Sequence, residues 1–103
     1  MMNPVNLDQR IREIFAPVHP RLLLLFGSQA RGDADELSDV DLIVVYDTEK
    51  RFLDRLAELY RLWNLPGAVD ILAYTPAEFD RMKETSGFVA AAVAEGRIIF
   101  EAA

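Results

Sequence analysis

Residues 21–28 of this sequence read Arg-Leu-Leu-Leu-Leu-Phe-Gly-Ser, residues 38–42 read Ser-Asp-Val-Asp-Leu, and these two stretches decide the fold. The first is an apolar run that a glycine stops, which predicts a strand over residues 21–26 with both faces buried. The second opens another apolar run and predicts a strand over residues 40–46. A third apolar run predicts a strand over residues 69–74. Each of the three predicted strands has a glycine–serine pair or aspartates at one end.

Helices are predicted around these strands. Apolar residues at helical spacing predict a helix over about residues 7–16, which Pro17 and Pro20 end. Asp47 or Thr48 is the predicted cap of a helix over about residues 49–63, whose apolar stripe comprises Phe52, Leu53, Leu56, Tyr60 and Trp63. Thr75-Pro76-Ala77-Glu78 has the residues of a capping box and predicts another helix start.

Four shorter elements complete the prediction: a helical turn over residues 28–32, an acidic loop over 33–38, a helix over 87–95 and a strand over 97–100. The order of helices and strands predicts the α+β class, with a small mixed sheet flanked by helices.

The polar residues at the strand ends can meet only in one topology. Gly27 and Ser28 follow the first strand, whereas Asp39 and Asp41 open the second and Asp70 opens the third. The first and second strands must therefore run antiparallel, and the second and third must run parallel. Parallel neighbours need a long crossover, which the helix over residues 49–63 supplies.

The three aspartates predict a metal site. Side chains alternate along a strand, so Asp39 and Asp41 share a face. Two carboxylates about 4 Å apart repel by roughly 4 kcal/mol at an effective dielectric near 20. A cation bound between them turns this unfavourable electrostatic energy into a favourable one. Oxygen ligands alone suit Mg²⁺ or Mn²⁺, which also bridge to substrate phosphates.

A phosphate cradle is predicted beside this metal site. Gly27 lets the backbone approach a phosphate, Ser28 offers a hydroxyl and an amide, and Arg31 lies one turn further on. In a two-metal nucleotidyl transfer one ion activates the attacking hydroxyl, and Asp70 is the predicted general base for it. The site would therefore handle a nucleoside triphosphate.

Composition limits the partners. The chain has 103 residues, no cysteine, and 17 acidic against 11 basic residues, so its net charge is −6. We expect one domain over residues 1–103 and no direct nucleic-acid binding, because such binding draws on lysine and arginine. The apolar runs are too short to span a membrane, and the N-terminus lacks the pattern of a signal peptide, so we expect a cytoplasmic protein.

The quoted motifs resemble a known signature. Residues 25–32 followed by Ser38-Asp39-Val40-Asp41-Leu42 are similar to the DNA-polymerase-β-like nucleotidyltransferases, and in particular to the minimal nucleotidyltransferase family. The ten residues (29–38) between Gly27-Ser28 and the Asp39-Val40-Asp41 pair fit that family, and Val69-Asp70-Ile71-Leu72 resembles its third-carboxylate strand.

The resemblance implies more than the spacing does. It implies a polymerase-β-palm-like fold, ATP as substrate, and a HEPN-domain ribonuclease toxin as partner. Members of the family act as antitoxins by transferring AMP to a tyrosine of that toxin. Two alternatives stay open: an antitoxin that masks its partner by binding alone, and a subunit of a nucleotidyltransferase that modifies a small molecule.

Overall fold

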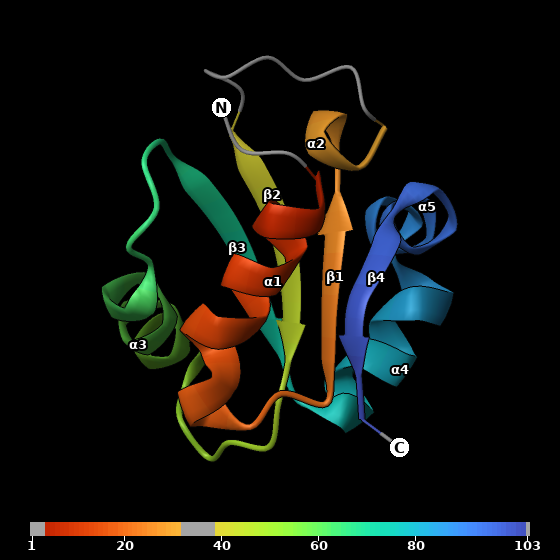
Figure 1. Ribbon diagram of the computed structural model, residues 1–103. Coiled ribbons are helices and arrows are strands. Elements are labelled where there is room, and N and C mark those ends of the chain that lie inside the picture. The colour runs from red at the N-terminus through yellow and green to blue at the C-terminus, as the bar shows by residue number, and fades with distance from the viewer. Residues whose placement is uncertain (1–3, 32–38, 103) are drawn as a thin grey trace.

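The sheet has four strands in the order β3-β2-β1-β4, in a computed structural model that describes residues 4–31 and 39–102 (Figure 1). Strand β1 (Leu22–Phe26) is antiparallel both to β2 (Val40–Val45) and to β4 (Arg97–Glu101). Strand β3 (Val69–Tyr74) is parallel to β2. The predicted α+β class is confirmed, and so are the strand directions that the aspartates required.

The helices lie close to their predicted positions. The chain forms α1 (Pro4–Phe15), the short 3-10 helix η1 (Ala16–Val18), α2 (Ser28–Arg31), α3 (Phe52–Leu62), α4 (Pro76–Thr85) and α5 (Gly87–Glu95). The capping box of α4 is confirmed, because Thr75 Oγ1 accepts from the Glu78 amide and Glu78 Oε1 accepts from the Thr75 amide. The acidic loop predicted over residues 33–38 lies outside the described residues.

The predicted start of α3 is wrong. The helix begins at Phe52, and Arg51 occupies the N-cap position in place of Asp47 or Thr48. The Thr48 hydroxyl accepts a hydrogen bond from the Lys50 amide at 3.1 Å, so it closes a local turn before the helix begins. Serine and threonine form such turns as readily as they form caps, and sequence does not separate the two roles.

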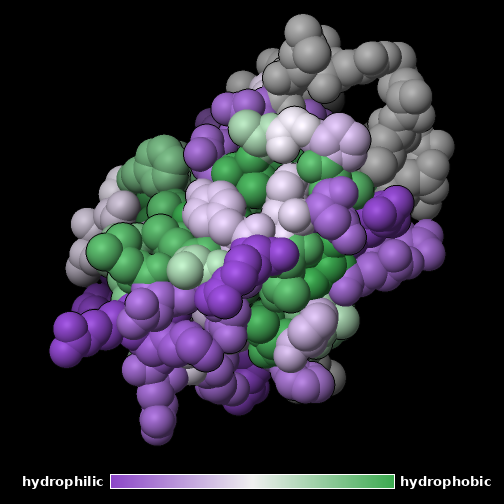
Figure 2. All heavy atoms as spheres, turned by 90° about the vertical axis from the view of Figure 1, so that its left-hand side faces the viewer, coloured by the Kyte–Doolittle hydropathy of each residue, from purple (hydrophilic) through white to green (hydrophobic). Residues whose placement is uncertain are grey.

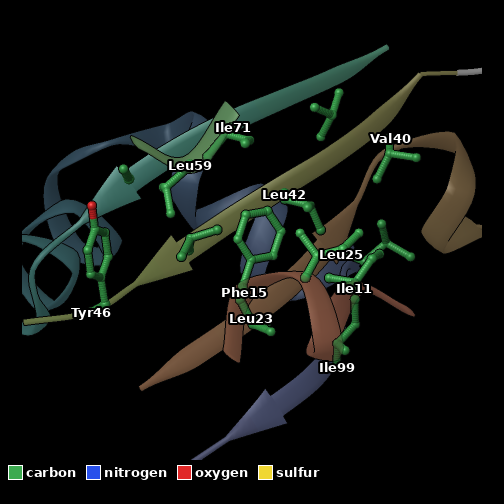
Figure 3. Packing of buried hydrophobic residues seen from close by; sticks show 14 residues of the cluster. Ile11, Phe15, Leu23, Leu25, Val40, Leu42, Tyr46, Leu59, Ile71 and Ile99 are labelled. Carbon is green, nitrogen blue, oxygen red and sulfur yellow. The ribbon is translucent and has the colours of Figure 1, made fainter. Parts of the chain in front are cut away.

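Two apolar clusters sandwich the sheet. On one face, Ile11 and Phe15 of α1 and Leu59 of α3 pack against Leu23 and Leu42 of the sheet (Figure 3). On the other face, side chains of α4 and α5 pack against the alternate strand positions, in a cluster made of Leu22, Leu24, Ile43, Val45, Phe79, Val89 and Ala92. Strand β1 contributes to both clusters, which is why its sequence is apolar without alternation.

The buried face of α3 differs from its predicted apolar stripe. Leu53 and Phe52 are 75% and 43% exposed, whereas Leu59 is fully buried and Arg55 is only 8% exposed. Arg55 Nη1 donates to Glu78 Oε1 at 2.6 Å, and Arg55 Nε donates to the Lys50 carbonyl at 2.7 Å. This ion pair joins α3 to α4 and holds the pKa of the Glu78 carboxyl below its usual value. The helix is therefore rotated relative to the prediction because a partnered arginine takes an inward position.

The surface around α3 mixes apolar and polar side chains. Figure 2, which views the molecule from the left-hand side of Figure 1, shows apolar groups between hydrophilic ones. Tyr60, predicted as core, is 40% exposed, and its hydroxyl accepts from the Ile71 amide at 3.1 Å. Among the described residues, no helix is both long and apolar enough to cross a membrane.

Candidate active site at one end of the sheet

The predicted site residues gather at one end of the sheet. Strand β1 ends there, β2 and β3 begin there, and α2 follows directly (Figure 1). In the register, Phe26 pairs with Asp41, and Asp41 in turn pairs with Asp70. The Val40 amide donates to the Ala68 carbonyl at 3.1 Å, so the parallel pairing reaches the very start of both strands. Asp39 directly precedes β2.

Asp41 and Asp70 belong to the sheet face that α4 and α5 cover. Their neighbours Leu42 and Ile71 belong to the cluster under α1 and α3, and side chains alternate along each strand. Asp39 and Asp70 are exposed, whereas Asp41 is half-buried. The helical cover of this face therefore stops short of the aspartates.

The structure brings the aspartates to one edge without closing a ligand shell. Within the described residues, no three Asp, Glu, His or Cys side chains are grouped tightly enough to hold a metal ion. Asp41 and Asp70 are direct cross-strand partners, and Asp39 precedes Asp41 by two positions. The donors, which are carboxylate oxygens alone, are of the kind that a hard divalent cation such as Mg²⁺ prefers.

Gly27 determines where the Asp41 carboxylate can lie. Its φ is +76°, in the left-handed region that favours glycine. A Cβ atom added to Gly27 would overlap Asp41 Oδ2 and would also crowd Asp41 Cγ. The carboxylate therefore occupies the space that any larger residue would fill. Sequence reasoning assigned this glycine to phosphate approach alone, and the carboxylate contact was missed.

Ser28 and Arg31 are the first and last residues of α2. The Ala30 amide donates to the Gly27 carbonyl at 3.2 Å, which fixes the turn between β1 and this short helix. Ser28 is therefore held next to Gly27 at this end of the sheet. The Arg31 side chain lies outside the described residues.

An aromatic pair also borders the site. Phe26 and Phe88 of α5 meet edge to face with ring centroids 5.7 Å apart. Phe26 is the register partner of Asp41 and packs with the apolar cluster under α4 and α5. Sequence reasoning missed this neighbour because a phenylalanine inside a predicted helix carries no sign of which strand it will meet.

Two tyrosines at the far ends of β2 and β3 have raised pKa values. Burial, followed by the hydrogen bond from its hydroxyl to Glu58, raises the pKa of Tyr46 to about 12. Burial, and then the nearby Glu78 carboxylate, raises the pKa of Tyr74. Both tyrosines lie at the opposite end of the strands from the aspartates, so they belong to the scaffold.

Known proteins share sequence with this chain. The family described as "Polymerase beta, Nucleotidyltransferase" matches residues 9–103. A Methanocaldococcus jannaschii protein named "Putative protein adenylyltransferase MJ0435" is 32% identical over 74 residues, which cover 71% of this chain and 80% of that protein.

Solved structures share the fold. A Sulfolobus solfataricus protein described as a "putative nucleotidyltransferase" superposes with a TM-score of 0.61 at 23% identity, over 92% of this chain and 77% of that chain. A toxin–antitoxin structure with AMP-PNP superposes with a TM-score of 0.57 at 18% identity, over 92% and 73% of the two chains. Since the family match spans nearly the whole chain and the fold agrees, this chain belongs to the polymerase β nucleotidyltransferase family.

Proposed function

We propose that this chain is a Mg²⁺-dependent protein adenylyltransferase that transfers AMP from ATP to a tyrosine of a HEPN ribonuclease toxin and so acts as its antitoxin. The observation that carries the proposal is the contact of Gly27 with Asp41, in register with Asp70. The name of the M. jannaschii relative supports protein adenylylation, and the toxin–antitoxin neighbours support a toxin as partner. Residues 1–103 would act as one domain, with the acceptor on another chain.

Each residue at the sheet end has a distinct part in this proposal. Asp39, Asp41 and Asp70 would hold Mg²⁺, or Mn²⁺ in its place, through carboxylate oxygens. The ion, when bound, supplies neutralising charge for the triphosphate and for the pyrophosphate that leaves. Ser28 would bind the triphosphate through its hydroxyl and amide, and Arg31 would add a positive charge nearby.

The proposed transfer of AMP needs one bond to form, one bond to break and one proton to be accepted. The phenol oxygen of the acceptor tyrosine forms a bond to the α-phosphorus of ATP, and the bond from that phosphorus to the bridging oxygen of the β-phosphate breaks. Pyrophosphate leaves with the electron pair. The phenol proton passes to the Asp70 carboxylate, which is exposed and so can be reached by an acceptor from another chain.

A second candidate is neutralisation by binding alone. Large apolar side chains are exposed on two helices, with Leu53 at 75% and Phe88 at 63%. Such residues favour a protein interface whether or not chemistry takes place.

Intact-mass spectrometry separates these candidates. The chain is incubated with Mg²⁺, ATP and the product of the neighbouring gene, and the partner's mass is measured. We expect one or more added AMP units, a full loss with Asp41→Asn, and no loss with the matched control Asp80→Asn, whose carboxylate is exposed on α4. An unchanged partner mass in a complex that still forms would reject the enzymatic proposal in favour of masking.

A further inference from the structure

An exposed aromatic ring packs on Phe26, the strand neighbour of Asp41. Phe88 is 63% exposed, although one side of it meets Phe26 at a centroid distance of 5.7 Å and an interplanar angle of 87°. Phe26 is half-buried and lies directly across the strand pair from Asp41. Cross-strand partners place their Cβ atoms about 5 Å apart, so Phe26 is an immediate neighbour of Asp41 and Phe88 lies one ring further on.

The position of Phe88 is fixed by the residues around it. It is the second residue of α5, and the Ser86 hydroxyl caps this helix by accepting from the Val89 amide at 3.2 Å. Val89 is 1% exposed and Ala92 is 5% exposed, so they anchor the helix on the sheet. Phe88 is thus presented on a rigid element while most of its ring area stays in contact with solvent.

Most of the Phe88 side chain is left in water. Burying a phenylalanine side chain is worth about 1.5–3 kcal/mol, and Phe88 gains only part of this from Phe26. Phe88 is connected to the polar end of the sheet through Phe26, whose register partner is Asp41. A flat ring beside a phosphate-binding turn and carboxylates suits a ligand that joins a planar base to phosphates.

We propose that Phe88, supported by Phe26, is the surface on which the base of the nucleotide substrate stacks. This inference rests on the proposed function and adds a determinant of nucleotide binding to it. The phosphates would lie at Ser28 and the aspartates, and the ribose would span the distance to the base on α5. Every nucleobase has a face that can stack, so Phe88 gives affinity for the base with little choice between adenine and guanine.

Binding titrations with two ligands test this role. AMP-PNP carries phosphates and a base, whereas inorganic tripolyphosphate carries phosphates alone. We expect Phe88→Ala to weaken the binding of AMP-PNP in Mg²⁺ by roughly 5- to 100-fold and to leave tripolyphosphate binding within about twofold. Phe88→Trp should retain AMP-PNP binding, because it keeps an aromatic face.

Two further variants guard against effects of folding. Phe88→Leu keeps apolar packing on Phe26 without an aromatic face, so it should lose AMP-PNP affinity while keeping thermal stability. Phe100→Ala is the matched control, since Phe100 is a 37% exposed phenylalanine on β4 whose loss should leave both ligands unaffected.

Several results would overturn the proposal. Unchanged AMP-PNP binding by both Phe88→Ala and Phe88→Leu would do so, as would an equal loss of tripolyphosphate binding. An effect confined to the KM of the protein acceptor would reassign Phe88 to partner docking. If the wild-type chain bound neither ligand, the proposed function itself would fail, whereas wild-type binding that is indifferent to Phe88 would reject this inference alone.

Discussion

Replacing Gly27 by alanine should separate the catalytic arrangement from the fold. The substitution has two physical effects. A non-glycine residue in the left-handed region costs about 1–2 kcal/mol of stability, and Gly27 has a φ of +76°. The new Cβ would also overlap Asp41 Oδ2, so the carboxylate must move to another position.

The expected loss of activity exceeds the loss of stability. A displacement of about 1 Å in a catalytic constellation can lower the rate roughly 100-fold. We therefore expect Gly27→Ala to lower the rate of AMP transfer by about two orders of magnitude. The backbone cost of about 1–2 kcal/mol should lower the melting temperature by roughly 4–16 °C in a domain of this size.

The matched control for this variant is Gly67→Ala. Gly67 has a φ of +90°, but a Cβ there would meet no atom within 4 Å. It should therefore lose a similar amount of stability and keep full activity. Rates are measured as AMP incorporation by intact mass at a temperature where both variants are folded, with melting followed by circular dichroism. Equal activities in the two variants would refute the argument that Gly27 positions Asp41.

Two other predictions concern the scaffold. Leu59→Ala should lower the free energy of unfolding by about 2–5 kcal/mol, because Leu59 is fully buried. Leu53→Ala should change it by no more than about 0.5 kcal/mol, because Leu53 is exposed. Urea denaturation measures both values, and the reverse ranking would contradict the assignment of Leu59 to the buried face of α3. In the folded state the pKa of Glu78 is lowered by the hydrogen bond from Arg55, by the Thr75 amide and by the Arg55 charge. Glu78 therefore stabilises the fold at pH values above its unfolded pKa of about 4.3, and this contribution is lost as the pH falls through the folded pKa. Glu78→Gln should therefore be less stable than wild type at pH 7 and show a shallower loss of stability below about pH 4.5; parallel curves for the two proteins would show that the ion pair adds no stability.

The arrangement of the strands could be predicted because the chemistry restricted it. Gly27, Asp41 and Asp70 lie at strand ends. These ends meet only if β1 is antiparallel to β2 and β3 is parallel to β2. The apolar runs located the strands, and the capping box at Thr75 located the start of α4. Local sequence and one requirement of the site were together sufficient for the directions of β1, β2 and β3, whereas the place of β4 beside β1 was not predicted.

The details that could not be predicted depend on tertiary contacts. Arg55 is buried on α3 because Glu78 of a later helix receives its guanidinium, and nothing near Arg55 in sequence indicates that partner. The exposure of Leu53 follows from the same rotation of the helix. Likewise, Phe88 reaches Phe26 only because α5 packs on the sheet through Val89 and Ala92, so its place beside Phe26 could not be predicted from its own segment.

The pairing of β1 with β4 has a consequence for how the chain folds. β1 pairs with β2 after a short connection, whereas its pairing with β4 joins residues that lie far apart in the sequence, from Leu22 with Glu101 to Leu25 with Arg97. Contacts between distant segments form late, because closing the long loop between them costs entropy. Until β4 arrives, β1 presents an open edge made of four consecutive leucines, which invites pairing with another molecule. At high protein concentration, β4 must therefore add to the sheet faster than two molecules meet through β1. A chain shortened before Arg97 should aggregate, although every site residue is still present.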